Sequence, residues 1–107
     1  MAVLLNISRY HTMMQEFAEK GSIKMKVYGN SMTPIIESGS LLTFVKSEKY
    51  EVGDIVFCKV KGRFIDAHKI TKESPDKGYM IANNHGWENG WTKQIFGKVT
   101  EINGIAR

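Results

Sequence analysis

The spacing of hydrophobic and polar positions changes from a helical period to a strand period near residue 21. Between residues 8 and 20, apolar side chains recur at i, i+3, i+4, i+7 and i+8, which predicts an amphipathic helix with a stripe of Tyr10, Met13, Met14, Phe17 and Ala18. From residue 22 onward, runs rich in β-branched and aromatic residues predict strands at residues 23–28, 41–45, 55–60, 64–70, 79–82 and 95–102. Turn residues separate these runs, tightly at residues 61–63 and 74–78, whereas residues 83–93 predict a long loop. The pattern therefore predicts a mainly β protein with an N-terminal helix.

Length and composition restrict the class of protein. A chain of 107 residues suits a single hydrophobic core. We divide the chain into a helical arm (1–21) and a β domain (22–107). The net charge of +4 comes from scattered Lys and Arg without a nucleic-acid motif, so nucleic acid is a disfavoured partner. Cys58 is the only cysteine, which excludes an internal disulfide and favours a reducing compartment, the cytoplasm. No apolar run is long enough to span a membrane, and no residue spacing indicates a metal or cofactor.

Ser31 lies in a segment that suits an exposed nucleophile. The chain reads Gly-Asn-Ser-Met-Thr-Pro from Gly29 to Pro34, directly after a predicted strand. Glycine permits unusual backbone angles and proline removes an N–H donor, so such a turn exposes the hydroxyl and leaves nearby N–H groups unpaired. A nucleophile and its oxyanion site need both features.

A serine nucleophile also needs a base, and the chain has three histidines. His11 lies on the predicted helix and His85 in the predicted loop, whereas His68 lies on a predicted strand, which holds a base more rigidly. Lys69 is the rival base, because adjacent strand residues point to opposite faces and a shift of one residue exchanges them. His68 is favoured, since lysine would need its pKa lowered by desolvation.

These motifs together resemble the superfamily of signal peptidases and LexA-type repressors, which are serine peptidases. The resemblance rests on the Ser31 box, then Glu-Ser-Gly at 37–39, Val-Gly-Asp-Ile-Val at 52–56 and His-Lys-Ile at 68–70. In this superfamily a Gly-x-Ser-Met-x-Pro box holds the nucleophile and a later strand supplies the base. The resemblance covers residues 26–102 and implies a compact LexA/signal-peptidase-like β-clip or half-barrel. A histidine at the base position is similar to the histidine-type branch, as in archaeal and endoplasmic-reticulum signal peptidases.

The resemblance implies a role for each site residue. Ser31 would be the nucleophile and His68 the base, and the Ser31 backbone N–H would bind the oxyanion with Asn30 as a second candidate. The third group, which orients the histidine, stays open, because the family uses an acid from a Gly-Asp-Asn stretch where this chain has two asparagines. The candidates are Asn83, Asn84, Glu88 and Asp66, and a Ser-His dyad is a further alternative.

The expected protein is a stand-alone, soluble serine endopeptidase that cleaves a peptide or protein substrate in trans. We expect no membrane anchor, and the residues before the first strand are too few for a repressor's helix-turn-helix domain. The compact form is similar to phage or bacterial stand-alone members. The alternative is a catalytically silent module of the same fold that serves protein binding or dimerisation, and a homodimer stays open in both cases.

Overall fold

The computed structural model describes residues 2–107, with side chains from Arg9 onward. These residues form one helix and eight strands. The elements are α1 (Ala2–Lys20), β1 (Ser22–Lys26), β2 (Leu41–Val45), β3 (Ile55–Val60), β4 (Arg63–Ser74), β5 (Gly78–Ala82), β6 (Glu88–Thr92), β7 (Gln94–Ile102) and β8 (Ile105–Ala106).

Most elements lie where the sequence pattern predicts them. The helix begins at Ala2, earlier than predicted, and ends at Lys20. The tight turns at residues 61–63 and 74–78 are confirmed, since they join β3 to β4 and β4 to β5. The prediction of one long loop over residues 83–93 is wrong, because β6 lies within it and pairs with β5. The Asn-Gly pair of β6 is typical of a turn, and pairing with a neighbouring strand overrides that local preference.

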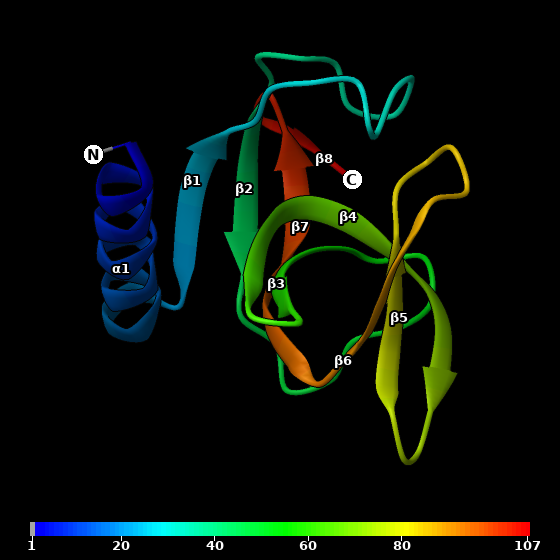
Figure 1. Ribbon diagram of the computed structural model, residues 1–107. Coiled ribbons are helices and arrows are strands. Elements are labelled where there is room, and N and C mark those ends of the chain that lie inside the picture. Colours follow the sequence, from blue (N-terminus) through cyan, green and yellow to red (C-terminus); the bar gives the residue numbers. More distant parts are fainter. Residues whose placement is uncertain (1) are drawn as a thin grey trace.

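All eight strands belong to one antiparallel sheet (Figure 1). Their order is β1-β2-β7-β3-β4-β5-β6, and β8 pairs with β7. Strand β4 is long and curved (Figure 1), and the register shifts where it pairs with β3 and with β5. The curl brings β6 back to β3, where the Thr92 hydroxyl donates to the Lys59 carbonyl at 2.6 Å. The predicted mainly β fold with an N-terminal helix is therefore confirmed, as an open and curled antiparallel sheet.

Strand β3 lies between two hydrophobic clusters. Ile55 and Phe57 belong to the larger cluster, which α1 covers, whereas Val56 and Cys58 belong to the smaller one. Successive strand residues point to opposite faces, so a strand with both faces covered is a continuous apolar run. Strand β3 is thus held from both sides, and it supports β4, which carries His68.

Helix α1 lies beside β1 and packs on the larger cluster (Figure 1). Its residue Phe17 is only 3% exposed and lies directly over Gly97 of β7. A Cβ atom on Gly97 would lie 2.3 Å from Cζ of Phe17. Glycine is therefore needed at residue 97 for the helix to approach the sheet this closely.

We expect Gly97→Ala to destabilise the fold by about 1–3 kcal/mol, because the added methyl group and the Phe17 ring would occupy the same space. Urea unfolding followed by circular dichroism measures the change. The control repeats the substitution in a Phe17→Leu background, where the smaller side chain leaves room for the methyl group. An equal loss in both backgrounds would show that the close contact is not the cause.

Candidate active site

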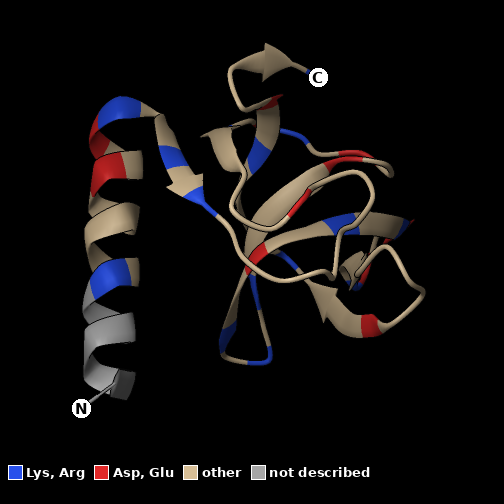
Figure 2. Ribbon diagram, turned by 90° about the horizontal axis from the view of Figure 1, so that it is seen from above, with Lys and Arg blue, Asp and Glu red and all other residues tan. Residues whose placement is uncertain are grey.

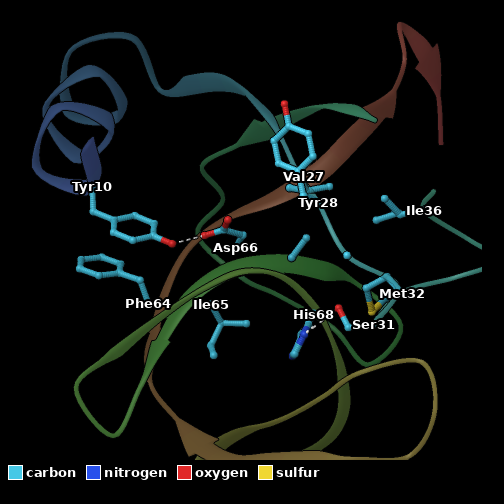
Figure 3. A pocket seen from close by; sticks show the side chains of 12 residues that line it. Tyr10, Val27, Tyr28, Ser31, Met32, Ile36, Phe64, Ile65, Asp66 and His68 are labelled. Atoms are coloured by element: carbon cyan, nitrogen blue, oxygen red, sulfur yellow. Dashed lines mark hydrogen bonds between the residues drawn. The ribbon is translucent and has the colours of Figure 1, made fainter. Parts of the chain in front are cut away.

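The Ser31 segment forms a compact turn after β1. Gly29 has a φ of +101°, a left-handed conformation that favours glycine, and its N–H donates to Oγ of Ser38 at 3.0 Å. The N–H and the hydroxyl of Thr33 donate to the Asn30 carbonyl at 3.3 and 2.9 Å. These bonds fix the backbone on both sides of Ser31, whose side chain points toward β4 (Figure 3).

His68 follows an irregularity in the pairing of β4 with β3. Cys58 pairs with Ile65, and Val56 pairs with His68, so β4 has one residue more than β3 between the two pairs. Such a bulge changes the direction of the side chains near it. Asp66 and His68 accordingly point to opposite sides of β4 (Figure 3), whereas a regular strand would put them on the same face.

The turn and the bulge bring Ser31 and His68 together. Oγ of Ser31 lies 3.2 Å from Nε2 of His68 (Figure 3). The other ring nitrogen, Nδ1, lies 2.6 Å from Oδ1 of Asn89. Because an amide oxygen only accepts hydrogen bonds, Nδ1 donates its proton to Asn89 and Nε2 is left to accept the Ser31 hydroxyl proton. A general base needs this tautomer.

Asn89 completes this array, and the sequence analysis did not identify it. It lies on β6, which β5 separates from β4 in the sheet order, and the curl of the sheet directs its side chain back to His68. The residue falls within the predicted loop, and a loop prediction assigns no direction to its side chains.

The two predicted acidic candidates for the third group have partners other than His68. Asp66 accepts a hydrogen bond from the Tyr10 hydroxyl of α1. Glu88 forms an ion pair with Lys72 at 3.2 Å. Neither carboxylate is hydrogen-bonded to His68 in the described part of the chain, where Asn89 is the partner of Nδ1.

Asn84 and Lys69 hold the serine turn instead of contacting the His68 ring. The Asn84 N–H donates to the Ser31 carbonyl at 2.8 Å, and its side-chain amide donates to the Thr33 carbonyl at 2.9 Å. Nζ of Lys69 donates to Oδ1 of Asn84 at 3.2 Å. The predicted rival base is therefore bonded to the scaffold of the turn, and His68 is the residue that faces the hydroxyl.

Asn83, the remaining candidate, stabilises its own loop. Its Oδ1 accepts the N–H groups of His85 and Trp87 at 2.8 and 3.0 Å. Nε2 of His85 in turn donates to the Asn30 carbonyl at 2.9 Å. Asn83 is thus linked to the serine turn through His85, and its side chain is hydrogen-bonded within its own loop rather than to the His68 ring.

Burial lowers the pKa of His68 below its ordinary value of 6.5. The hydrogen bond to Asn89 and the charge of Asp66 act in the opposite direction but do not reverse this shift. His68 is therefore neutral at pH 7, which is the form that accepts a proton.

The Ser31 hydroxyl borders a cavity of about 310 Å³ (Figure 3). The cavity lies between the chain that follows β1 and the first half of β4, and Ser31 and His68 both line it. Its apolar lining includes Val27, Met32, Ile36 and Ala67. The polar side chains of Ser31, Asp66 and His68 share this lining, so the cavity is a mixed cleft with the reactive groups at its wall.

The backbone N–H of Ser31 has no hydrogen-bond partner among the backbone of residues 2–107 and the side chains described from Arg9 onward. It is therefore available to an anion that forms beside the hydroxyl. The Asn30 carbonyl accepts hydrogen bonds from Thr33 and His85, which holds the peptide before Ser31 in place. Within the described residues, no group of three His, Cys, Asp or Glu side chains is arranged to hold a metal ion.

The curled sheet and the serine turn define a peptidase-like fold. The family described as Peptidase S24-like matches the chain over residues 2–105, so the protein belongs to that family. This match confirms the resemblance seen in the sequence motifs. No curated protein matches the chain. The one helix described within residues 2–107 is not apolar enough along its length to cross a membrane.

Proposed function

We propose that this protein is a serine endopeptidase with Ser31 as nucleophile, His68 as base and Asn89 as the residue that positions the base. The observation that carries the proposal is the 3.2 Å contact between Oγ of Ser31 and the acceptor nitrogen of His68. Membership of the Peptidase S24-like family supports it. The test is covalent labelling of Ser31 by a fluorophosphonate, located by mass spectrometry.

In the proposed reaction, Nε2 of His68 takes the hydroxyl proton as Oγ of Ser31 attacks the carbonyl carbon of the substrate. The Ser31 backbone N–H donates to the resulting oxyanion. His68 then gives its proton to the leaving amine as the C–N bond breaks, which leaves an acyl group on Ser31. Water attacks this ester, transfers a proton to His68 and releases the acid, and the proton returns to Ser31.

The free edge of β4 suggests how a substrate docks in trans. Strand β5 pairs with β4 only from Lys69 onward, so residues 63–68 pair with β3 alone. Residues 64–68 line the cavity beside Ser31. An extended peptide added at this edge would satisfy the open backbone groups and bring a peptide bond to the nucleophile.

A binding module without catalytic activity is the second candidate function. It is favoured by the fact that the Asn89 side chain is an uncharged amide. In the Ser-His-Asp arrangement a carboxylate stabilises the imidazolium that forms during attack. The amide of Asn89 orients the His68 ring but supplies no negative charge. Labelling of Ser31 separates the two candidates, because a silent module would not react.

The pH dependence of labelling tests the role of Asn89. We expect the rate to rise with pH through the pKa of His68, below 6.5, and to stay constant above it, because only neutral imidazole accepts the proton. Asn89→Asp should raise the pKa of His68 and move this rise to higher pH, since a carboxylate favours the imidazolium.

Asn89→Leu serves as the control, because it removes the hydrogen bond without adding a charge. It should lower the labelling rate and the pKa of His68 together. A pH profile that is identical in all three proteins would contradict a positioning role for Asn89.

A further inference from the structure

The outer edge of β1 is unpaired. Strand β1 lies at the end of the sheet and pairs only with β2. The carbonyl of Gly21 and both backbone groups of Val27 bond toward the β2 side. Because these directions alternate along an antiparallel strand, the backbone groups of Lys24, Lys26 and Tyr28 point away from β2. Helix α1 lies beside this edge (Figure 1), so a further strand would have to enter the groove that separates β1 from the helix.

The unpaired edge continues the cavity beside Ser31. A groove of about 630 Å³ lies between α1 and β1, and Lys24, Lys26 and Arg9 line it. Tyr28 and Asp66 line both this groove and the cavity that contains Ser31. The groove and the cavity therefore adjoin at these two residues.

The side chains on this edge are basic and exposed. Lys24 and Lys26 alternate with buried residues of β1, so both point to the solvent face, and Figure 2 shows the basic positions of β1 beside α1. Neither lysine forms an ion pair within the described residues. The one carboxylate of the groove, Asp66, is already engaged by Arg9 at 3.9 Å and by the Tyr10 hydroxyl.

We propose that the outer edge of β1 binds an acidic, extended segment of the substrate, at a distance from the cleaved bond. This inference rests on the proposed peptidase function and specifies its substrate class. Glu or Asp at alternate positions would lie opposite Lys24 and Lys26 on the same face, where opposite charges stabilise strand pairing. A second copy of this chain fits less well, because two β1 edges would bring four lysines together on one face.

Peptide binding to the Ser31→Ala variant tests the inference, because this variant holds a substrate without turnover. The probes are fluorescein-labelled peptides of alternating Val and Glu and of alternating Val and Gln, followed by fluorescence anisotropy. We expect the Glu peptide to bind about threefold to tenfold more tightly at low salt, with the difference lost at high salt. Equal affinity for the two peptides would overturn the proposal.

Three further double variants test whether Lys24 and Lys26 cause the preference for the Glu peptide. Lys24→Gln/Lys26→Gln should remove the preference for Glu, and the matched variant Lys49→Gln/Lys93→Gln, with the same net charge, should keep it. Lys24→Glu/Lys26→Glu should instead prefer a peptide of alternating Val and Lys, which a misfolded protein would not do. An equal loss in the matched variant would overturn the proposal, as would tighter binding of a thymidine oligonucleotide than of the Glu peptide.

Failure of this inference is distinguishable from failure of the peptidase function. Absence of fluorophosphonate labelling in the unmodified protein would contradict the peptidase and leave the peptide-binding result standing. Labelling without any preference for the Glu peptide would contradict the acidic docking edge and leave the peptidase standing.

Discussion

His68→Ala should slow fluorophosphonate labelling of Ser31 by about 10²- to 10⁴-fold, which is the usual contribution of a general base. The reason is that the Ser31 hydroxyl loses the only side-chain nitrogen within 3.2 Å among the described residues. Without that acceptor, a serine hydroxyl is a weak nucleophile near neutral pH. Intact-mass spectrometry over time measures the rate, and Ser31→Ala should show no labelling at this position.

Two variants control for effects other than the loss of the base. His11→Ala removes an exposed histidine of α1 and should leave the rate unchanged. Lys69→Met removes the hydrogen bond to Asn84, which holds the serine turn, and should slow labelling by less than about tenfold. A much larger loss in Lys69→Met than in His68→Ala would transfer the role of base to Lys69.

The labelling rates also decide between the two candidate functions. If unmodified protein reacts and His68→Ala does not, then Ser31 is an activated nucleophile and the peptidase is supported. If the unmodified protein stays unlabelled at all pH values between about 6 and 9, a range in which neutral imidazole is available to accept the proton, the binding module is favoured.

Phe57→Ala should destabilise the fold by about 3–5 kcal/mol, the usual cost of removing a buried aromatic ring. The Phe57 side chain is fully buried on β3. Its ring centroid lies 5.2–6.3 Å from those of Tyr10, Phe17, Phe44, Phe64 and Phe96. These rings come from α1, β2, β4 and β7, so one truncation weakens contacts among four elements. Urea unfolding measures the loss, which is a large part of the stability of a typical small domain.

Phe57→Leu is the control, because it keeps most of the buried apolar volume. We expect a loss clearly smaller than for Phe57→Ala, since the remaining cavity is smaller. The same experiment tests the support of the site, because Phe57 underlies Phe64 of β4 and Tyr10 of α1. If both variants unfold at the same urea concentration as the unmodified protein, Phe57 is not the centre of the core.

Much of the fold follows from local patterns. The helix and most strands were predicted from hydrophobic spacing, because amphipathic elements repeat with their own period. Strand β6 was missed because its Asn-Gly pair is typical of a turn. Its strand conformation depends on pairing with β5, a contact between separate segments that no local pattern contains.

The sequence alone pointed to Ser31 as nucleophile and favoured His68 over Lys69 as base, since the Ser31 box and the His68 strand are local motifs in a fixed order. The tertiary structure decided which groups surround them. A bulge of one residue in β4 sends Asp66 toward α1 and His68 toward Ser31, which reverses the expectation from regular alternation. The curl of the sheet then brings Asn89 to the far side of the His68 ring. Bulges and strand returns arise from pairing between distant segments, so they are settled only when the whole sheet is formed.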